Sequence, residues 1–158
     1  MAWPIYNHTM AQYAAKTSSP EHTGLPGRAL GLKAESSSEL IRQVTRGFSY
    51  HVIRALETHS GIGLPEIASV IGLPARTLAR RKASGRLTPD ESEKLLRLSS
   101  VFEQALDLFE GKQSDALKWL TTPKKALENQ TPLFYARTEL GAREIANLIG
   151  RLEHGVYS

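Results

Sequence analysis

The side chains best suited to chemistry form a basic run between residues 73 and 87. No acidic residue occurs between Glu66 and Asp90. Guanidinium and ammonium groups bind phosphate oxygens, and arginine also pairs with the guanine edge in a DNA major groove. A charge run can equally be a solvated helix face. The candidate nucleic-acid contacts are Arg76, Thr77, Arg80, Arg81, Lys82 and Arg86.

The residues around this run follow the spacing of a helix-turn-helix. Ala68 allows two helices to approach, Gly72 lies four residues later at the turn, and Leu78 follows six residues after that on the buried side of the second helix. This spacing predicts that the basic run lies on the second helix. Pro74 occupies the position where a capping serine or threonine is expected, which departs from the usual pattern.

A second candidate site lies at the C-terminal end of the sequence. Gly155 is placed to end a helix in the left-handed conformation, and an apolar-aromatic tail follows it. Such a tail can project from the rigid helix at a fixed angle. Cations in a last helical turn can guide the tail or simply complement the helix dipole. The candidate partner contacts are Arg151, His154, Gly155, Val156, Tyr157 and Ser158.

Catalytic chemistry finds no support in the sequence. The five histidines are scattered without metal-ligand spacing, cysteine is absent, and no glycine-rich phosphate loop occurs. Three nearby carboxylates, Asp90, Glu91 and Glu93, are explained by a helix N-terminus, where the dipole favours acids. We therefore expect no catalytic residue, no cofactor and no metal, and a protein that is not an enzyme.

The elements that must position these sites are all helices. Apolar residues over 36–59 follow helical spacing, with Gly47 dividing them into two helices. Thr88 and the following Pro89 predict the start of a long helix that ends near Gly111 and is apolar on nearly every face, as in a central helix packed on several sides. Thr131 and Thr138 predict two further helix starts.

These patterns predict an all-α fold in which a helix-turn-helix bundle is joined by a long central helix to a small C-terminal helical unit. The expected divisions are an irregular, proline- and glycine-rich arm (1–35), the helix-turn-helix region with the central helix (36–111) and the C-terminal unit (112–158). The lack of cysteine fits a reducing compartment. No membrane-length apolar run or signal-peptide core is seen, so we expect a cytoplasmic protein without a membrane partner.

The C-terminal unit resembles the toxin-binding domain of the Xre/MbcA/ParS antitoxin family, and the resemblance extends upstream to about residue 36. It rests on several landmarks in the right order. These are Ala116-Leu117-Lys118-Trp119-Leu120, Thr122-Pro123, Ala126-Leu127, Thr131-Pro132-Leu133, Thr138-Glu139-Leu140-Gly141-Ala142 and Arg151 through Ser158.

The resemblance implies an antitoxin of a type II toxin-antitoxin system. The ending Glu153 to Ser158 looks most like antitoxins paired with RES-domain toxins, which act on NAD. The implied partners are a cognate RES-domain toxin, operator DNA and a second copy of the chain, within a larger toxin-antitoxin complex. In the implied mechanism the antitoxin covers the NAD pocket and does no chemistry itself. From the tail residues we further expect Tyr157 to fill an apolar slot and the terminal carboxylate to stand in for an anionic group. The alternative to this tail contact is that the helix face alone makes the interface. The alternative is a stand-alone helix-turn-helix repressor whose C-terminal domain mediates dimerisation.

Overall fold

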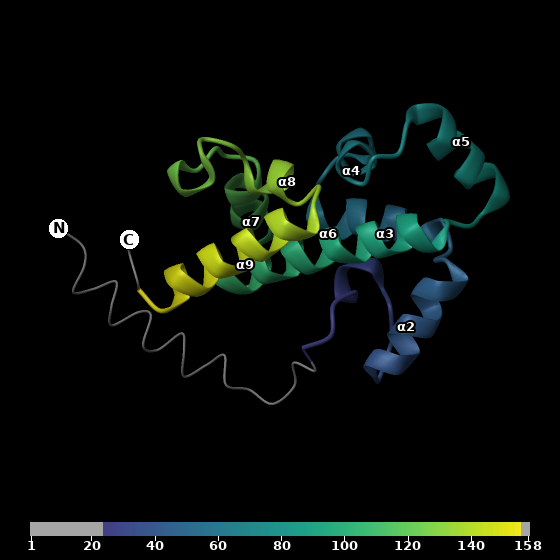
Figure 1. The fold of residues 1–158 in the computed structure, drawn as a ribbon, viewed down its shortest axis with the longest axis horizontal. Helices are drawn as coiled ribbons and strands as arrows, with labels where there is room; N and C mark the ends of the chain where they lie inside the picture. The colour runs from purple at the N-terminus through teal and green to yellow at the C-terminus, as the bar shows by residue number, and fades with distance from the viewer. Residues whose placement is uncertain (1–23, 156–158) are drawn as a thin grey trace.

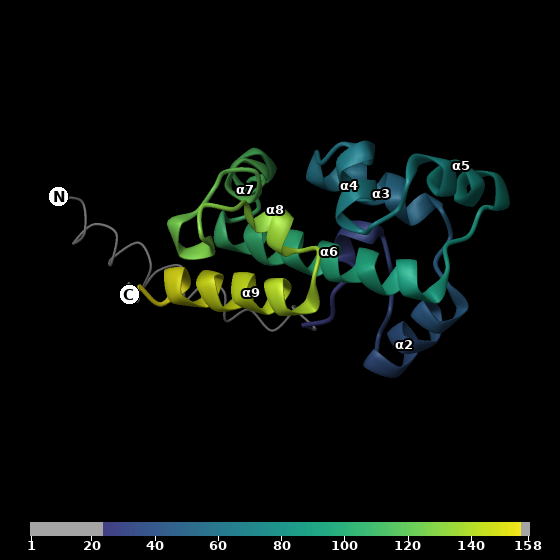
Figure 2. The same ribbon diagram turned by 45° about the horizontal axis from the view of Figure 1, so that its top comes forward.

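A single long helix, α6 (Pro89–Leu108), forms the centre of the molecule, and the other elements pack around it (Figures 1 and 2). The structure is a computed structural model that describes residues 24–155. In chain order the remaining elements are η1 (Arg28–Leu30), α2 (Ser37–Arg46), α3 (His51–Ser60), α4 (Leu64–Val70), α5 (Ala75–Ser84), α7 (Gln113–Leu120), η2 (Lys125–Leu127), α8 (Pro132–Tyr135) and α9 (Glu139–Glu153).

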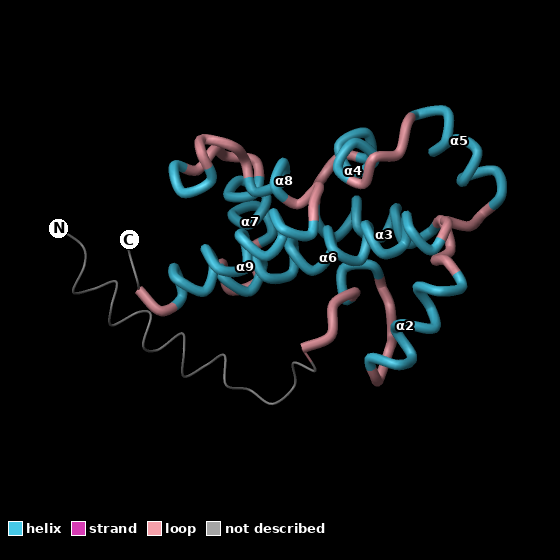
Figure 3. The backbone as a smooth tube through the Cα atoms, viewed as in Figure 1, coloured by secondary structure: helices cyan, strands magenta, loops and turns pink. Residues whose placement is uncertain are grey.

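The described residues contain helices and loops but no strand, which confirms the predicted all-α fold (Figure 3). The central helix packs against η1, α2, α3, α7 and α9. Its side chains Leu95, Leu98 and Phe102 are completely buried. The prediction of a helix covered on several sides is therefore confirmed.

The start of α6 is set by residues that lie next to one another in the sequence. The hydroxyl of Thr88 accepts a hydrogen bond from the backbone N–H of Glu91 at 3.2 Å, and the Glu91 carboxylate accepts one from the backbone N–H of Thr88 at 2.9 Å. This reciprocal capping box satisfies two donors that the helix itself cannot. Pro89 at the first helical position costs no hydrogen bond.

Gly47 separates α2 from α3, as predicted. Its φ of 80° lies in the left-handed region, and a side chain there would collide with the carbonyl oxygen of Leu87. The chain between the two helices then runs beside the start of α6, where the backbone N–H of Phe48 donates to the Ser92 hydroxyl at 2.8 Å. The glycine therefore permits both the turn and the close approach of two backbone segments.

The part of the predicted irregular arm that the structure describes, residues 24–35, packs on the core through one short helix. Residues Arg28–Leu30 form the 3-10 helix η1, and Leu30 is 3% exposed. The buried carboxylate of Glu103 on α6 accepts hydrogen bonds from the backbone N–H of Gly27 at 3.2 Å and of Ala29 at 2.8 Å. These contacts join positions more than seventy residues apart, so local composition could not predict them.

The C-terminal unit consists of α7, η2, α8 and α9, with α9 lying along α6 (Figures 1 and 2). Thr131 caps α8 and Thr138 caps α9, which confirms both predicted starts. Ile145, Leu148 and Ile149 on α9 are buried against the rest of the protein. The C-terminal unit therefore shares one continuous apolar core with the N-terminal elements.

Candidate functional site

The turn between α4 and α5 has the geometry that the sequence predicts for a helix-turn-helix. Ala68 is buried, and the backbone N–H of Leu73 donates to its carbonyl oxygen at 2.7 Å. Gly72 has a φ of 69°, in the left-handed region that glycine adopts without strain. Pro74 precedes α5 without a side-chain cap, as its chemistry requires.

Helix α5 projects from one end of the molecule (Figure 1) and has no buried residue. Leu78, predicted to lie on the buried side, is only partly buried against the core. The side chains of Arg76, Arg80 and Lys82 are exposed, and Thr77 is half-buried. The helix thus presents a cationic surface to the solvent.

Arg81 on the same helix is turned toward α6 instead. Its Nε donates to both Glu91 oxygens, at 3.0 and 2.9 Å. Burial by itself would raise the pKa of Glu91, but the Arg81 guanidinium and the Thr88 backbone N–H outweigh burial and lower that pKa. The hydrogen bond to Glu91 correspondingly raises the pKa of Arg81. This pair attaches α5 to the capping box of α6.

Arg86, the last cation of the run, also has a structural role. Its Nη1 donates to the carbonyl oxygen of Gly47 at 2.7 Å and to that of Arg46 at 3.3 Å. It thereby satisfies the last carbonyls of α2, which lack partners within the helix. The structure therefore separates the six predicted DNA contacts: Arg81 and Arg86 hold other elements, and the other four remain on the surface of α5.

The predicted partner-binding end of α9 is described only as far as Gly155. Gly155 has a φ of 68°, which confirms the expected left-handed residue at the helix end. Arg151 is half-buried and His154 is exposed. Burial raises the pKa of the neighbouring Glu153. The predicted contacts Val156, Tyr157 and Ser158 lie outside the described residues.

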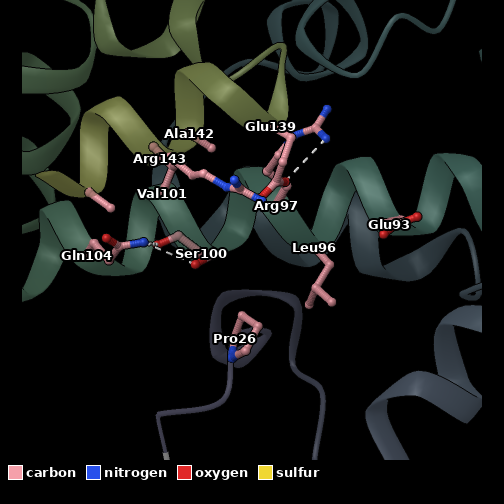
Figure 4. A pocket seen from close by; sticks show the side chains of 11 residues that line it. Pro26, Glu93, Leu96, Arg97, Ser100, Val101, Gln104, Glu139, Ala142 and Arg143 are labelled. Carbon is pink, nitrogen blue, oxygen red and sulfur yellow. Dashed lines mark hydrogen bonds and ion pairs between the residues drawn. The ribbon is translucent and has the colours of Figure 1, made fainter. Parts of the chain in front are cut away.

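A joint between the two halves of the molecule was missed by the sequence analysis. Arg97 on α6 donates to the carbonyl oxygens of Ala136 at 3.4 Å and Arg137 at 3.0 Å. Its Nη1 also lies 3.8 Å from the Glu139 carboxylate, and Figure 4 shows this pair across the seam between α6 and α9. An arginine within a helix carries no sequence signal for such a role.

Arg137 extends the joint toward the helix-turn-helix. Its Nη2 donates to the Ser69 hydroxyl on α4 at 3.1 Å, and its guanidinium lies 5.0 Å from the centre of the Phe134 ring. The loop between α8 and α9 is therefore connected to both α6 and α4.

Within residues 24–155 no group of histidines and carboxylates could hold a metal ion. No helix of that part is long and apolar enough to cross a membrane.

The fold and these surfaces define a class of protein: a helix-turn-helix module sharing a central helix with a second helical module. Comparison with known families agrees with this division. Residues 39–100 match the antitoxin Xre-like helix-turn-helix domain, and residues 104–155 match the antitoxin Xre/MbcA/ParS C-terminal toxin-binding domain. The two matches meet inside α6, whereas the division that we predicted at residues 111–112 stays a prediction.

Two relatives give the family. An antitoxin Xre from Yersinia enterocolitica (serotype O:8 / biotype 1B) is 42% identical over 132 residues, which cover 83% of this chain and 89% of the relative. An antitoxin Xre from Photorhabdus laumondii subsp. laumondii is 33% identical with the same coverage of both chains. The chain belongs to the Xre antitoxin family. It combines a DNA-binding type of domain with a toxin-binding one, as an antitoxin of a type II system does.

Proposed function

We propose that the protein neutralises a RES-domain toxin by covering the toxin's NAD pocket, and that it represses its own operon through α5. The observation that carries the proposal is the match of residues 104–155 to a toxin-binding domain. This match begins within α6, the helix in which the match to the helix-turn-helix domain ends. No chemistry is required of the antitoxin, because steric exclusion of NAD is sufficient to stop the toxin.

The proposed blocking element is the segment 156–158 at the end of α9. An NAD site offers donors for the pyrophosphate and an apolar slot for a ring. Tyr157 supplies a ring for that slot, while Arg151 and His154 set the tail's approach from the last helical turn. The exposure of His154 and the helix end at Gly155 support this assignment, since both leave the last turn accessible to a partner.

The proposed operator contact is made by the exposed face of α5. One recognition helix covers about one half-site, so a dimer or a toxin-antitoxin complex with two copies would place a second α5 one DNA turn away. The cationic side chains Arg76, Arg80 and Lys82 support this proposal, because they have no competing role within the described part of the chain.

The test is co-expression with the protein encoded by the gene next to this one, which is the candidate toxin. Cell growth and cellular NAD are measured. Wild-type antitoxin should restore both. Deletion of residues 156–158 should leave the helical circular dichroism and toxin binding in place, with weaker affinity, but should not restore NAD. His154→Ala serves as a milder variant at the same end of α9.

Three results would change the proposal. Full neutralisation by the truncated protein would refute the tail mechanism and leave the antitoxin function standing. A toxic neighbour that leaves NAD unchanged would refute the RES assignment. Promoter binding without any protection by the wild-type protein would favour the stand-alone repressor.

A further inference from the structure

An open groove lies at the corner where α8 meets α9, separate from α5 and from the tail end of α9. Its volume is about 730 Å³. Its lining includes the side chains of Glu128, Phe134, Arg137, Leu140 and Glu144. The lining comes from the segment 126–130, from α8 with the loop that follows it, and from the start of α9. Thr131 caps the N-terminus of α8, and Thr138 caps that of α9.

The groove is bordered by large apolar side chains that the fold leaves in solvent. Phe134 is 47% exposed and Leu140 is 71% exposed. Among residues 24–155 the one other large hydrophobic side chain with such exposure is Ile41 on α2. Clustered exposed apolar groups on a soluble protein mark an interaction surface, whereas a single one is ordinary.

The backbone around the groove is held before any partner arrives. Arg137 lies over the Phe134 ring and is itself hydrogen-bonded to Ser69. Gly141 lies so close to the Tyr135 carbonyl oxygen that a side chain there would collide with it, so glycine permits this close approach of α9 to the end of α8. Anchors that are already ordered lose little conformational entropy on binding.

The position and charge of the groove identify its occupant. All of its lining residues fall within 104–155, the region matched to a toxin-binding domain. Glu128 and Glu144 line the groove and are exposed, and within the described part of the chain neither has an ion pair. The lining cation Arg137 is already engaged with Ser69 and the Phe134 ring. A partner surface with apolar side chains next to a lysine or arginine would complement these groups.

We infer that the toxin docks in this groove through an apolar, basic element, in addition to the contact proposed for the tail. The inference rests on the proposed toxin partner and adds a second contact at the opposite end of α9. Docking at both ends of one rigid helix would orient the tail relative to the toxin. It would also explain why Phe134 and Leu140 are left exposed.

The decisive experiment measures binding of the purified neighbouring-frame protein to full-length antitoxin by isothermal titration calorimetry. The double variant Phe134→Ala/Leu140→Ala should weaken binding by about 30-fold or more, because centrally placed apolar anchors dominate interfaces. Ile41→Ala removes an equally exposed apolar side chain outside the groove and should bind as the wild type does. Circular dichroism and thermal unfolding establish that each variant is folded.

A second measurement tests the charge of the occupant. Glu128→Gln/Glu144→Gln should slow association several-fold at low salt, and the difference should shrink as salt screens the charges. Unchanged association at low salt would refute a basic docking element.

The outcomes separate this inference from the proposed function. Wild-type affinity in the Phe134→Ala/Leu140→Ala variant would refute the groove and leave the antitoxin function standing. No binding by the wild-type protein would refute both. If the double variant binds toxin normally but forms a smaller assembly than the wild type in light scattering, the groove joins two antitoxin copies and the inference is wrong.

Discussion

The two helices that carry the predicted site residues are held by the fold in opposite ways. Helix α5 has no buried residue and is attached through Arg81 and the partly buried Leu78. Helix α9 buries Ile145, Leu148 and Ile149 against the core along its length. In Figure 2, α9 runs alongside α6, whereas α5 lies near one end of α6 and projects outward.

This difference suits two kinds of recognition. A helix that enters a DNA groove must leave one face of polar and cationic side chains in solvent, as α5 does with Arg76, Arg80 and Lys82. A helix that displays a protein-binding surface gains from a fixed position, because rigidity lowers the entropic cost of binding. The structure therefore predicts that α5 exchanges its amide hydrogens faster than α9 does.

The largest expected effect is a loss of folding stability that affects both halves of the molecule at once. Phe102→Ala removes a completely buried ring from α6, which both halves share, and should lower the free energy of unfolding by about 3–5 kcal/mol. Chemical denaturation followed by circular dichroism measures this loss. Phe134→Ala, at a half-exposed ring, is the matched control and should cost far less. Equal effects at the two positions would contradict the shared core.

A charge reversal should break the function of α5 alone. Arg76→Glu/Arg80→Glu should weaken promoter binding by about 100-fold, and each lost phosphate contact should reduce the salt dependence by about one unit of slope. A gel shift over a series of salt concentrations measures both. Lys118→Glu/Lys125→Glu makes the same change in net charge on the C-terminal unit and should bind the promoter nearly as well. Retained promoter binding in the α5 variant would assign α5 to self-association.

A glycine substitution should break the anchoring of α9. Gly141→Ala forces a side chain against the Tyr135 carbonyl oxygen and should cost about 1–3 kcal/mol of stability. Gly150→Ala on the same helix meets no atom within 4 Å and should stabilise the protein by up to ~1 kcal/mol, since alanine favours helix more than glycine does. Thermal unfolding distinguishes them. Equal shifts of both variants would show that the α8–α9 corner is loosely held.

Removal of the cap on α6 should have a smaller effect. Thr88→Ala deletes the hydroxyl that accepts from the Glu91 backbone and should cost about 1 kcal/mol. Thr45→Ala removes an exposed hydroxyl from the last turn of α2 and is the control, expected to be near neutral. Denaturant unfolding curves of the two variants, recorded in parallel, measure both losses of stability. Equal losses would contradict the role of the cap.

The smallest effect is a dependence of α5 on pH. The pKa of Glu91 is lowered below its ordinary value of 4.5 in the folded protein. The stability that ionised Glu91 contributes through its pairing with Arg81 is therefore complete above that value. It is lost as the pH falls through the lower pKa of the folded protein. Protection of α5 amides, measured by hydrogen exchange, should decline in acid while α9 is unchanged. Glu91→Gln keeps a capping-box residue and should remove this dependence; an unaltered acid decline would refute the role of the pair.

The helix boundaries were predictable because their signals are local. Thr88, Thr131 and Thr138 each cap a helix within three residues of themselves, and Gly47, Gly72 and Gly155 adopt the left-handed backbone that ends or turns a helix. Capping and positive φ depend on neighbours in the sequence, so no tertiary contact is needed to predict them. The all-α class followed from helical spacing and these caps, whereas the family resemblance rested on several sequence landmarks in the right order.

The roles of individual cations depended on the tertiary structure. Arg76 and Arg81 lie on the same helix and have the same chemistry, but only Arg81 faces a carboxylate of α6. Likewise, the buried Glu103 accepts a hydrogen bond from the backbone of η1. Phe134 and Leu140 stay exposed where α8 meets α9, next to the close approach that Gly141 permits. The sequence alone determined the starts of α6, α8 and α9 and the glycine turns, because those signals act over three or four residues. Only the folded chain decided which charges hold it together and which remain for partners, because that depends on groups brought together from distant positions.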